Sequence, residues 1–99
     1  MNRKISFSDV IEAMQTLFDI DPWSYFSVEN KFQTMWPNSL AAYCFHELCG
    51  LSNTEIAMKI HVHESTVGGR IRWWKEQGDM RFVTAIHGHS LAMQRLETP

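Results

Sequence analysis

Apolar residues recur at intervals of three and four along most of this 99-residue chain. That spacing puts side chains on one face of an α-helix and does not fit the strict alternation of a half-buried β-strand. Such stripes run through "ISFSDVIEAMQTLFDI", "SLAAYCFHELCG" and "SNTEIAMKI". Helices of this kind joined by short links predict an all-α fold, a small helical domain of about five helices.

Capping signals mark several helix ends. Ser52 followed three residues later by Glu55 is the pattern of a capping box, and Gly50 suits the position after the preceding helix. Asp21 and Pro22 suit the cap and first position of a short helical turn. Ser6 or Ser8 can cap the start of the first helix by accepting a hydrogen bond from a free backbone N–H. We therefore expect well-defined starts for the first helix, for the short turn at Pro22 and for the helix after Ser52.

Other boundaries are less sharply marked. The segment "SVENKFQTMWPN" is expected to be a loop leading into the central helix, with Pro37 near the start of that helix. Residues 79–96 are expected to form a last helix, although "HGH" at 87–89 weakens its pattern. The chain is thus expected to be a single domain, 1–99, with a core of 5–78 and this last helix.

Composition excludes some classes of protein. The chain is 44% hydrophobic, which is enough for a core, and no apolar run approaches the ~20 residues of a membrane span. The N-terminus lacks the apolar segment of a secretory signal, so Cys44 and Cys49 are expected to be reduced thiols in the cytoplasm. We expect no membrane and no small-molecule substrate among its partners.

The distribution of charge is more informative than its sum. A formal net charge of −2 argues mildly against nucleic-acid binding. Residues 59–75, however, hold four basic side chains against the single acidic Glu64. The basic residues are Lys59, Arg70, Arg72 and Lys75. A solvated helix face has the same pattern, so charge alone does not assign a function.

The stretch "IHVHESTVGGRIRWWKEQG", residues 60–78, has two interpretations. Gly68-Gly69 between "HVHESTV" and "RIRWW" is a signal for a two-residue β-hairpin turn. The helical interpretation puts Val67, Ile71 and Trp74 on one face, which would then be buried. It leaves an outward set of Ser65, Thr66, Gly69, Arg72, Trp73 and Glu76. The helix is favoured because the capped helix before it would otherwise lack a partner.

A capped helix, about three residues and then a second helix beginning near "STV" is the spacing of a helix-turn-helix. In that motif the second helix places its N-terminal residues in the major groove of DNA. Small hydroxyl side chains at that point permit close approach to phosphates and base edges. The motif is therefore expected within the helical domain.

The order of these elements resembles the C-terminal DNA-binding domain of the bacterial replication initiator DnaA family, over roughly residues 5–75. "ISFSDVIEAMQTLFDI" is similar to that domain's opening helix, and "SLAAYCFHELCGLSNTEIA" to its central helix and helix-turn-helix entry. "HESTV" stands where the family has Asp-His-Thr-Thr-Val. "GLSNTEIAMKI…STV" is also similar to LuxR-type and sigma-factor helix-turn-helix segments, over a shorter stretch.

The resemblance implies sequence-specific binding of double-stranded DNA, with no cofactor. The expected base-reading residues are His63, Glu64, Ser65, Thr66, Gly69 and Arg72. The expected phosphate contacts are Lys31, Lys59, Arg70 and Lys75. No G-x-x-x-x-G-K-[ST] pattern occurs, so the likeness does not extend to the family's ATPase. We expect a small standalone regulator of transcription or replication, of the kind that a phage, plasmid or mobile element carries.

Three positions depart from the family. Glu64 replaces its histidine, Asn38 replaces an arginine, and the loop "SVENKF" offers Lys31 alone where the family is rich in arginine. Losing phosphate contacts weakens the electrostatic part of DNA affinity. The alternative is therefore a protein-interaction module, or a homodimer, on the same scaffold, with Trp73 as a candidate contact.

No motif in the sequence specifically indicates a metal site or a catalytic site. On a helix Cys44 and His46 point about 200° apart, so they cannot share a metal ion on one face. Cys44 lies on the Leu40–Leu48 stripe and is expected to be a core thiol. His61 and His63 are interpreted as turn residues or DNA contacts. We expect no metal and no enzymatic activity.

Overall fold

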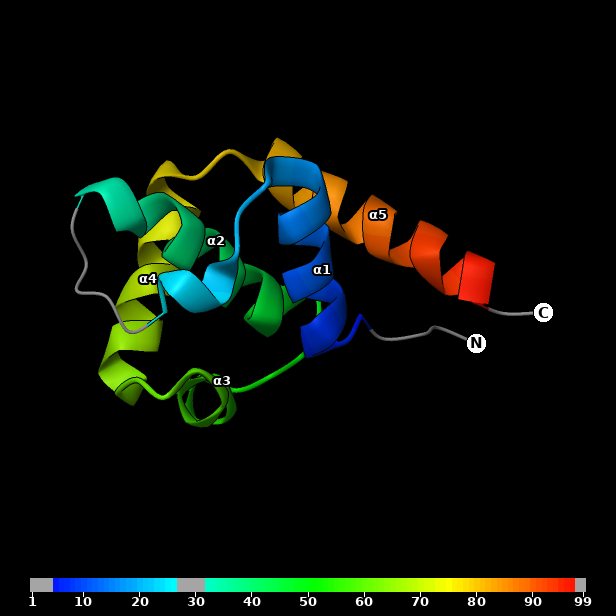
Figure 1. The fold of residues 1–99 in the computed structure, drawn as a ribbon. Coiled ribbons are helices and arrows are strands. Elements are labelled where there is room, and N and C mark those ends of the chain that lie inside the picture. The colour runs from blue at the N-terminus through cyan, green and yellow to red at the C-terminus, as the bar shows by residue number, and fades with distance from the viewer. Residues whose placement is uncertain (1–4, 27–31, 98–99) are drawn as a thin grey trace.

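The computed structural model describes residues 5–26 and 32–97, which form five α-helices and one short 3-10 helix (Figure 1). The elements are α1 Phe7–Phe18, η1 Pro22–Ser24, α2 Phe32–Glu47, α3 Asn53–Ile60, α4 Glu64–Gln77 and α5 Met80–Glu97. No strand occurs in these residues, so the predicted all-α class is confirmed. No helix within the described ranges has the length and apolar character needed to cross a bilayer.

Side-chain caps fix the starts of α1 and α3. Ser6 and Asp9 form a capping box, as do Ser52 and Glu55, each with N–H to oxygen distances of 2.9–3.1 Å. The hydrogen bond that the Ser52 backbone N–H donates lowers the pKa of Glu55. Asp21 caps η1 by accepting from the Trp23 backbone N–H, at 3.2 Å. The predicted starts of these three elements are confirmed.

The expected start of the central helix was wrong. α2 begins at Phe32, so Pro37 lies inside the helix rather than near its start. A proline there removes one backbone hydrogen bond, which normally disfavours a helix interior. Pro37 is buried, and Leu40 and Phe45 beyond it are fully buried as well. Burial of apolar side chains on several sides of α2 offsets the missing hydrogen bond.

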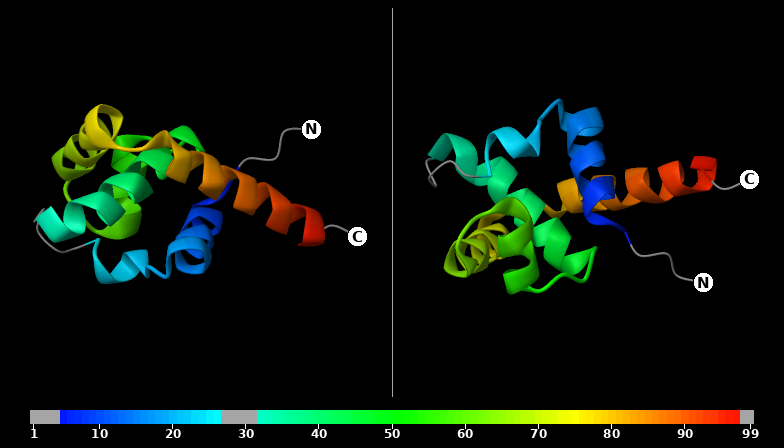
Figure 2. Two further views of the ribbon diagram at one scale, coloured as in Figure 1. Left: turned by 90° about the horizontal axis from the view of Figure 1, so that it is seen from above. Right: turned by 60° about the horizontal axis from the view of Figure 1, so that its bottom comes forward.

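Helix α2 runs through the centre of the molecule, and α1, α3, α4 and α5 all pack against it (Figures 1 and 2). The most extensive of these contacts is with α4, and α3 in turn packs on α4. α5 packs chiefly on α1, and its far end extends beyond the other helices (Figure 2). The α3–α4 pair and the projecting end of α5 therefore lie at different ends of the molecule.

An aromatic cluster joins α5 to the rest of the core. Phe82 of α5 lies edge-on to Trp36 of α2 and Phe18 of α1, with ring centroids 4.9 and 5.3 Å apart. Trp74 of α4 lies 6.1 Å from Trp36 and is fully buried. Such tilted pairs contribute about 0.5–1.5 kcal/mol each beyond the area they bury. One Phe on α5 thus contacts aromatic residues of three other helices.

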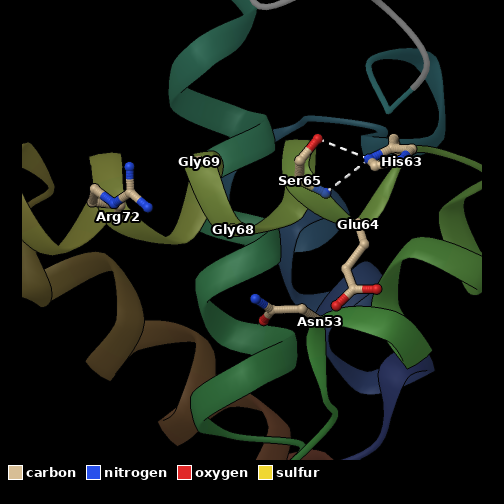
Figure 3. Close-up of a pocket in the computed structure, with 7 residues that line it drawn as sticks. All are labelled: Asn53, His63, Glu64, Ser65, Gly68, Gly69 and Arg72. Carbon is tan, nitrogen blue, oxygen red and sulfur yellow. Dashed lines mark hydrogen bonds between the residues drawn. The ribbon is translucent and has the colours of Figure 1, made fainter.

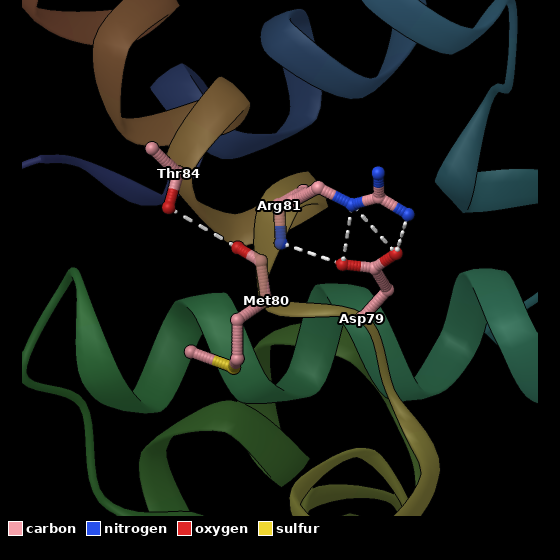
Figure 4. Close-up of polar contacts among 4 residues, drawn as sticks. All are labelled: Asp79, Met80, Arg81 and Thr84. Atoms are coloured by element: carbon pink, nitrogen blue, oxygen red, sulfur yellow. Dashed lines mark hydrogen bonds and ion pairs between the residues drawn. The ribbon is translucent and has the colours of Figure 1, made fainter.

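The turn between α4 and α5 is closed by local polar contacts (Figure 4). The Asp79 carboxylate accepts from the Arg81 backbone N–H at 2.9 Å and pairs with the Arg81 guanidinium at 2.6 Å. These hydrogen bonds from Arg81 lower the pKa of Asp79. The Thr84 hydroxyl donates to the Met80 carbonyl at 3.2 Å. α5 then continues through Gly88, so the last helix expected at 79–96 is present despite "HGH".

Arg70 was expected on the phosphate-binding surface, and that expectation is wrong. Its side chain is 1% exposed, and its guanidinium donates to the Phe26 carbonyl at 3.0 Å. Burial lowers the pKa of Arg70 below its usual range. The cause is its position on α4: Arg70 lies three residues after Val67 and four before Trp74, on the face that packs inward.

Replacing Arg70 by Met should lower the free energy of unfolding by about 2 kcal/mol, because a charged hydrogen bond to the Phe26 carbonyl is lost. Arg72→Met, on the exposed face, should change it by less than about 0.5 kcal/mol. Urea unfolding followed by tryptophan fluorescence measures both. Equal effects of the two substitutions would show that the buried hydrogen bond of Arg70 does not stabilise the fold.

Gly78 is required by its contact with Trp74. Its backbone is extended, but a methyl group added there would overlap the Trp74 indole. Gly78→Ala should therefore destabilise the protein by about 1–3 kcal/mol through overpacking. Thermal unfolding monitored by circular dichroism measures this. An unchanged midpoint would mean that Trp74 moves aside without cost.

Candidate functional site

Residues 64–77 form one continuous helix, so the helical interpretation of the Gly-Gly stretch is confirmed. Neither Gly68 nor Gly69 has a positive φ. Each costs a helix about 1 kcal/mol relative to alanine. Val67, Ile71 and Trp74 are 0%, 6% and 0% exposed, as predicted. Fully burying a large apolar side chain contributes about 1.5–3 kcal/mol, so the inner face outweighs both glycines.

The outer face of α4 forms one wall of an open groove of about 560 Å³ (Figure 3). Its lining residues are Asn53, His63, Glu64, Ser65, Gly68, Gly69 and Arg72. Five of the six predicted base-reading residues are thus brought together. Thr66, the sixth, is half-buried and does not line the groove. Asn53 comes from the first turn of α3, so the groove combines two helices.

His63 caps the start of α4. Its Nδ1 accepts from the Ser65 backbone N–H at 3.1 Å and lies 2.8 Å from the Ser65 hydroxyl oxygen. Nδ1 can accept only when it carries no proton, so the neutral ring has its hydrogen on Nε2. The hydroxyl of Ser65 can then donate to the same nitrogen. His63 and Ser65 are therefore held in place by each other (Figure 3).

The two glycines leave the middle of the groove without side chains. A methyl added at Gly69 would meet no atom within 4 Å, and one at Gly68 would come 3.6 Å from the Asn53 side-chain nitrogen. The α4 backbone is therefore accessible here to a partner that fits the groove. Sequence reasoning missed Gly68 and Asn53 as lining residues. Gly68 could have been found from its three-residue spacing after Ser65.

The other expected contact residues lie in different surroundings. Lys75 is exposed and lies one turn beyond Arg72 on the same face of α4. Lys59 is exposed, and its ammonium lies 5.4 Å from the centre of the Phe7 ring. Trp73 is half-buried, 6.2 Å from Trp74, so only part of its indole reaches the surface. Lys31 lies outside the described residues.

Charge along the outer face of α4 is nearly balanced. Arg72 and Lys75 are positive, while Glu64 begins the helix and Glu76 stands near its end. All four side chains are exposed. With Arg70 turned inward, the electrostatic attraction of this face for a polyanion is smaller than the sequence suggested. Asn38 adds nothing to it, because it is buried and donates to the Tyr25 carbonyl at 2.9 Å.

The cysteines belong to the core. Cys44 is fully buried, as expected, and burial raises the pKa of its thiol well above the usual value. Burial also raises the pKa of Cys49 to about 12. Neither thiol is disulfide-bonded. Within 5–26 and 32–97, no three His, Cys, Asp or Glu side chains are grouped so as to hold a metal ion.

Comparisons of this chain with protein-family models, with curated proteins and with solved structures found no match, so the groove and the α3–α4 pair are the observations from which a function is proposed.

Proposed function

We propose that this protein binds double-stranded DNA in a sequence-specific manner, with α3 and α4 acting as a helix-turn-helix. The observation that carries the proposal is the groove, in which the start and outer face of α4 present polar side chains around a glycine-lined centre. In this arrangement α4 enters the major groove and α3 lies across the backbone. The biological role is then control of transcription or replication.

The geometry supports different roles for the basic side chains. Arg72 lies in the groove itself and is positioned to donate to base edges. Lys75 extends the same face and is positioned to contact a phosphate. Lys59 lies beside the Phe7 ring, and in this proposal it contacts the DNA phosphate backbone from the α3 side. Arg70 has no such role because it is buried.

Arg72→Ala should weaken binding to a specific duplex about tenfold or more, since one good bidentate base contact contributes about 1–3 kcal/mol. Arg95→Ala, which removes the same charge from the exposed end of α5, should leave binding within about twofold. Electrophoretic shifts with random and genomic duplexes at low salt measure both. If the unmodified protein shifts no duplex, DNA binding is refuted.

Gly69→Ala and Gly88→Ala form a matched pair. Both glycines lie within helices, and a methyl at either meets no atom within 4 Å. Each substitution should therefore stabilise the fold by about 1 kcal/mol. Only Gly69→Ala adds a methyl to the groove, so only it should weaken duplex binding. Equal affinities in the two variants would mean that DNA does not approach the backbone at Gly69.

A protein-interaction module is the second candidate. The near-neutral outer face of α4 and the exposed Met58 of α3, 72% accessible, favour it. A complex of this kind should persist in Arg72→Ala and be lost in Met58→Asp, because the aspartate places a charge in an apolar contact. Co-purification followed by size-exclusion chromatography measures this. Loss of the complex in Arg72→Ala alone would favour DNA binding instead.

A further inference from the structure

Glu64 is the groove residue that DNA binding explains least, because its carboxylate repels phosphate. It lies at the first position of α4, exposed, and lines the groove together with Arg72 (Figure 3). Building on the proposed function, we propose that Glu64 and Arg72 read two separate base pairs, a C·G pair through its cytosine and a G·C pair through its guanine. The pairs between them face the two glycines and are left unread.

The side chains of the groove differ in charge. His63 and Ser65 are neutral and bond to each other through Nδ1, which leaves the His63 Nε2–H as a neutral donor. Glu64 and Arg72 make no side-chain hydrogen bond or ion pair with any other residue in the described ranges. These two charged groups are thus the strongest hydrogen-bonding groups that α4 offers to a ligand. Their charge therefore points to Glu64 and Arg72 as the residues that discriminate between bases.

The chemistry of each group selects a base. An ionised carboxylate only accepts hydrogen bonds, and the amino group at N4 of cytosine is the donor that glutamate pairs with in the major groove. A guanidinium only donates, and it fits the two acceptors O6 and N7 of guanine. Glu64 also disfavours any register that brings a phosphate to the start of α4. It therefore lowers affinity for unrelated DNA as well as favouring cytosine.

Helix geometry sets the spacing of the two contacts. Glu64 and Arg72 both line the groove and are eight residues apart along α4, which is about 12 Å at 1.5 Å per residue. Successive base pairs are about 3.4 Å apart along the duplex, so the two contacts lie at most about three to four base pairs apart. Gly68 and Gly69 stand midway and have no side chain with which to distinguish a base.

Selection of bound duplexes from a random pool tests the proposal, using the full chain and the variants Glu64→Gln and Glu76→Gln. The wild-type protein should select a cytosine and a guanine within four base pairs of each other, with tolerated pairs between. Glu64→Gln should lose the cytosine preference about tenfold and accept adenine there, since an amide pairs with adenine. The guanine preference should remain.

Glu76→Gln is the matched control, because it removes the same charge from an exposed position near the other end of α4 that does not line the groove. It should raise affinity for random duplex about as much as Glu64→Gln does, without changing the selected bases. An unchanged cytosine preference in Glu64→Gln overturns the inference while leaving DNA binding standing. Failure of the wild-type protein to enrich any duplex overturns the proposed function, and this inference with it.

Discussion

The packing of α4 on α2 is the contact on which the rest of the arrangement depends. Val67, Ile71 and Trp74 bury one side of a helix whose own sequence, with two adjacent glycines, is a weak helix former. Since that side is fixed inward, the opposite side is fixed outward. The orientation of α4 on α2 therefore determines the groove, its polar lining and the glycines at its centre.

Burial of Arg70 adds a second attachment for α4 and removes a positive charge from its outer face. The Arg70 guanidinium donates a hydrogen bond to the carbonyl of Phe26, which lies just after η1, and so connects α4 to that part of the chain. The basic charge it carries is therefore used inside the fold rather than toward a ligand. The proposed DNA interface therefore relies on hydrogen bonds from a few side chains more than on attraction between net charges.

Sequence reasoning predicted the elements that local signals specify. The capping box at Ser52 and the inner stripe of α4 follow from spacing alone, and the structure confirms them. The groove residues at 63–65 were expected from the resemblance, as the start of the second helix, and Arg72 was expected from the outward face of that helix.

The failures have physical causes. The charge of Arg70 predicts a surface position, but its spacing from Val67 and Trp74 puts it on the inward face. Pro37 was read as a helix start, but burial of its face holds the helix through it. Asn53 reaches the groove from another helix, and contacts between helices are not encoded in the periodicity of either one.

The most direct measurement of the central claim is a titration of isotopically labelled protein with duplex DNA, followed by amide chemical shifts. If DNA binds in the groove, the largest changes should fall on Asn53 and on residues 63–72, which form its walls. The exposed end of α5 near Arg95 should remain unchanged. Changes centred on α5, or no change at low salt, would contradict the assignment of the groove as the DNA-binding face.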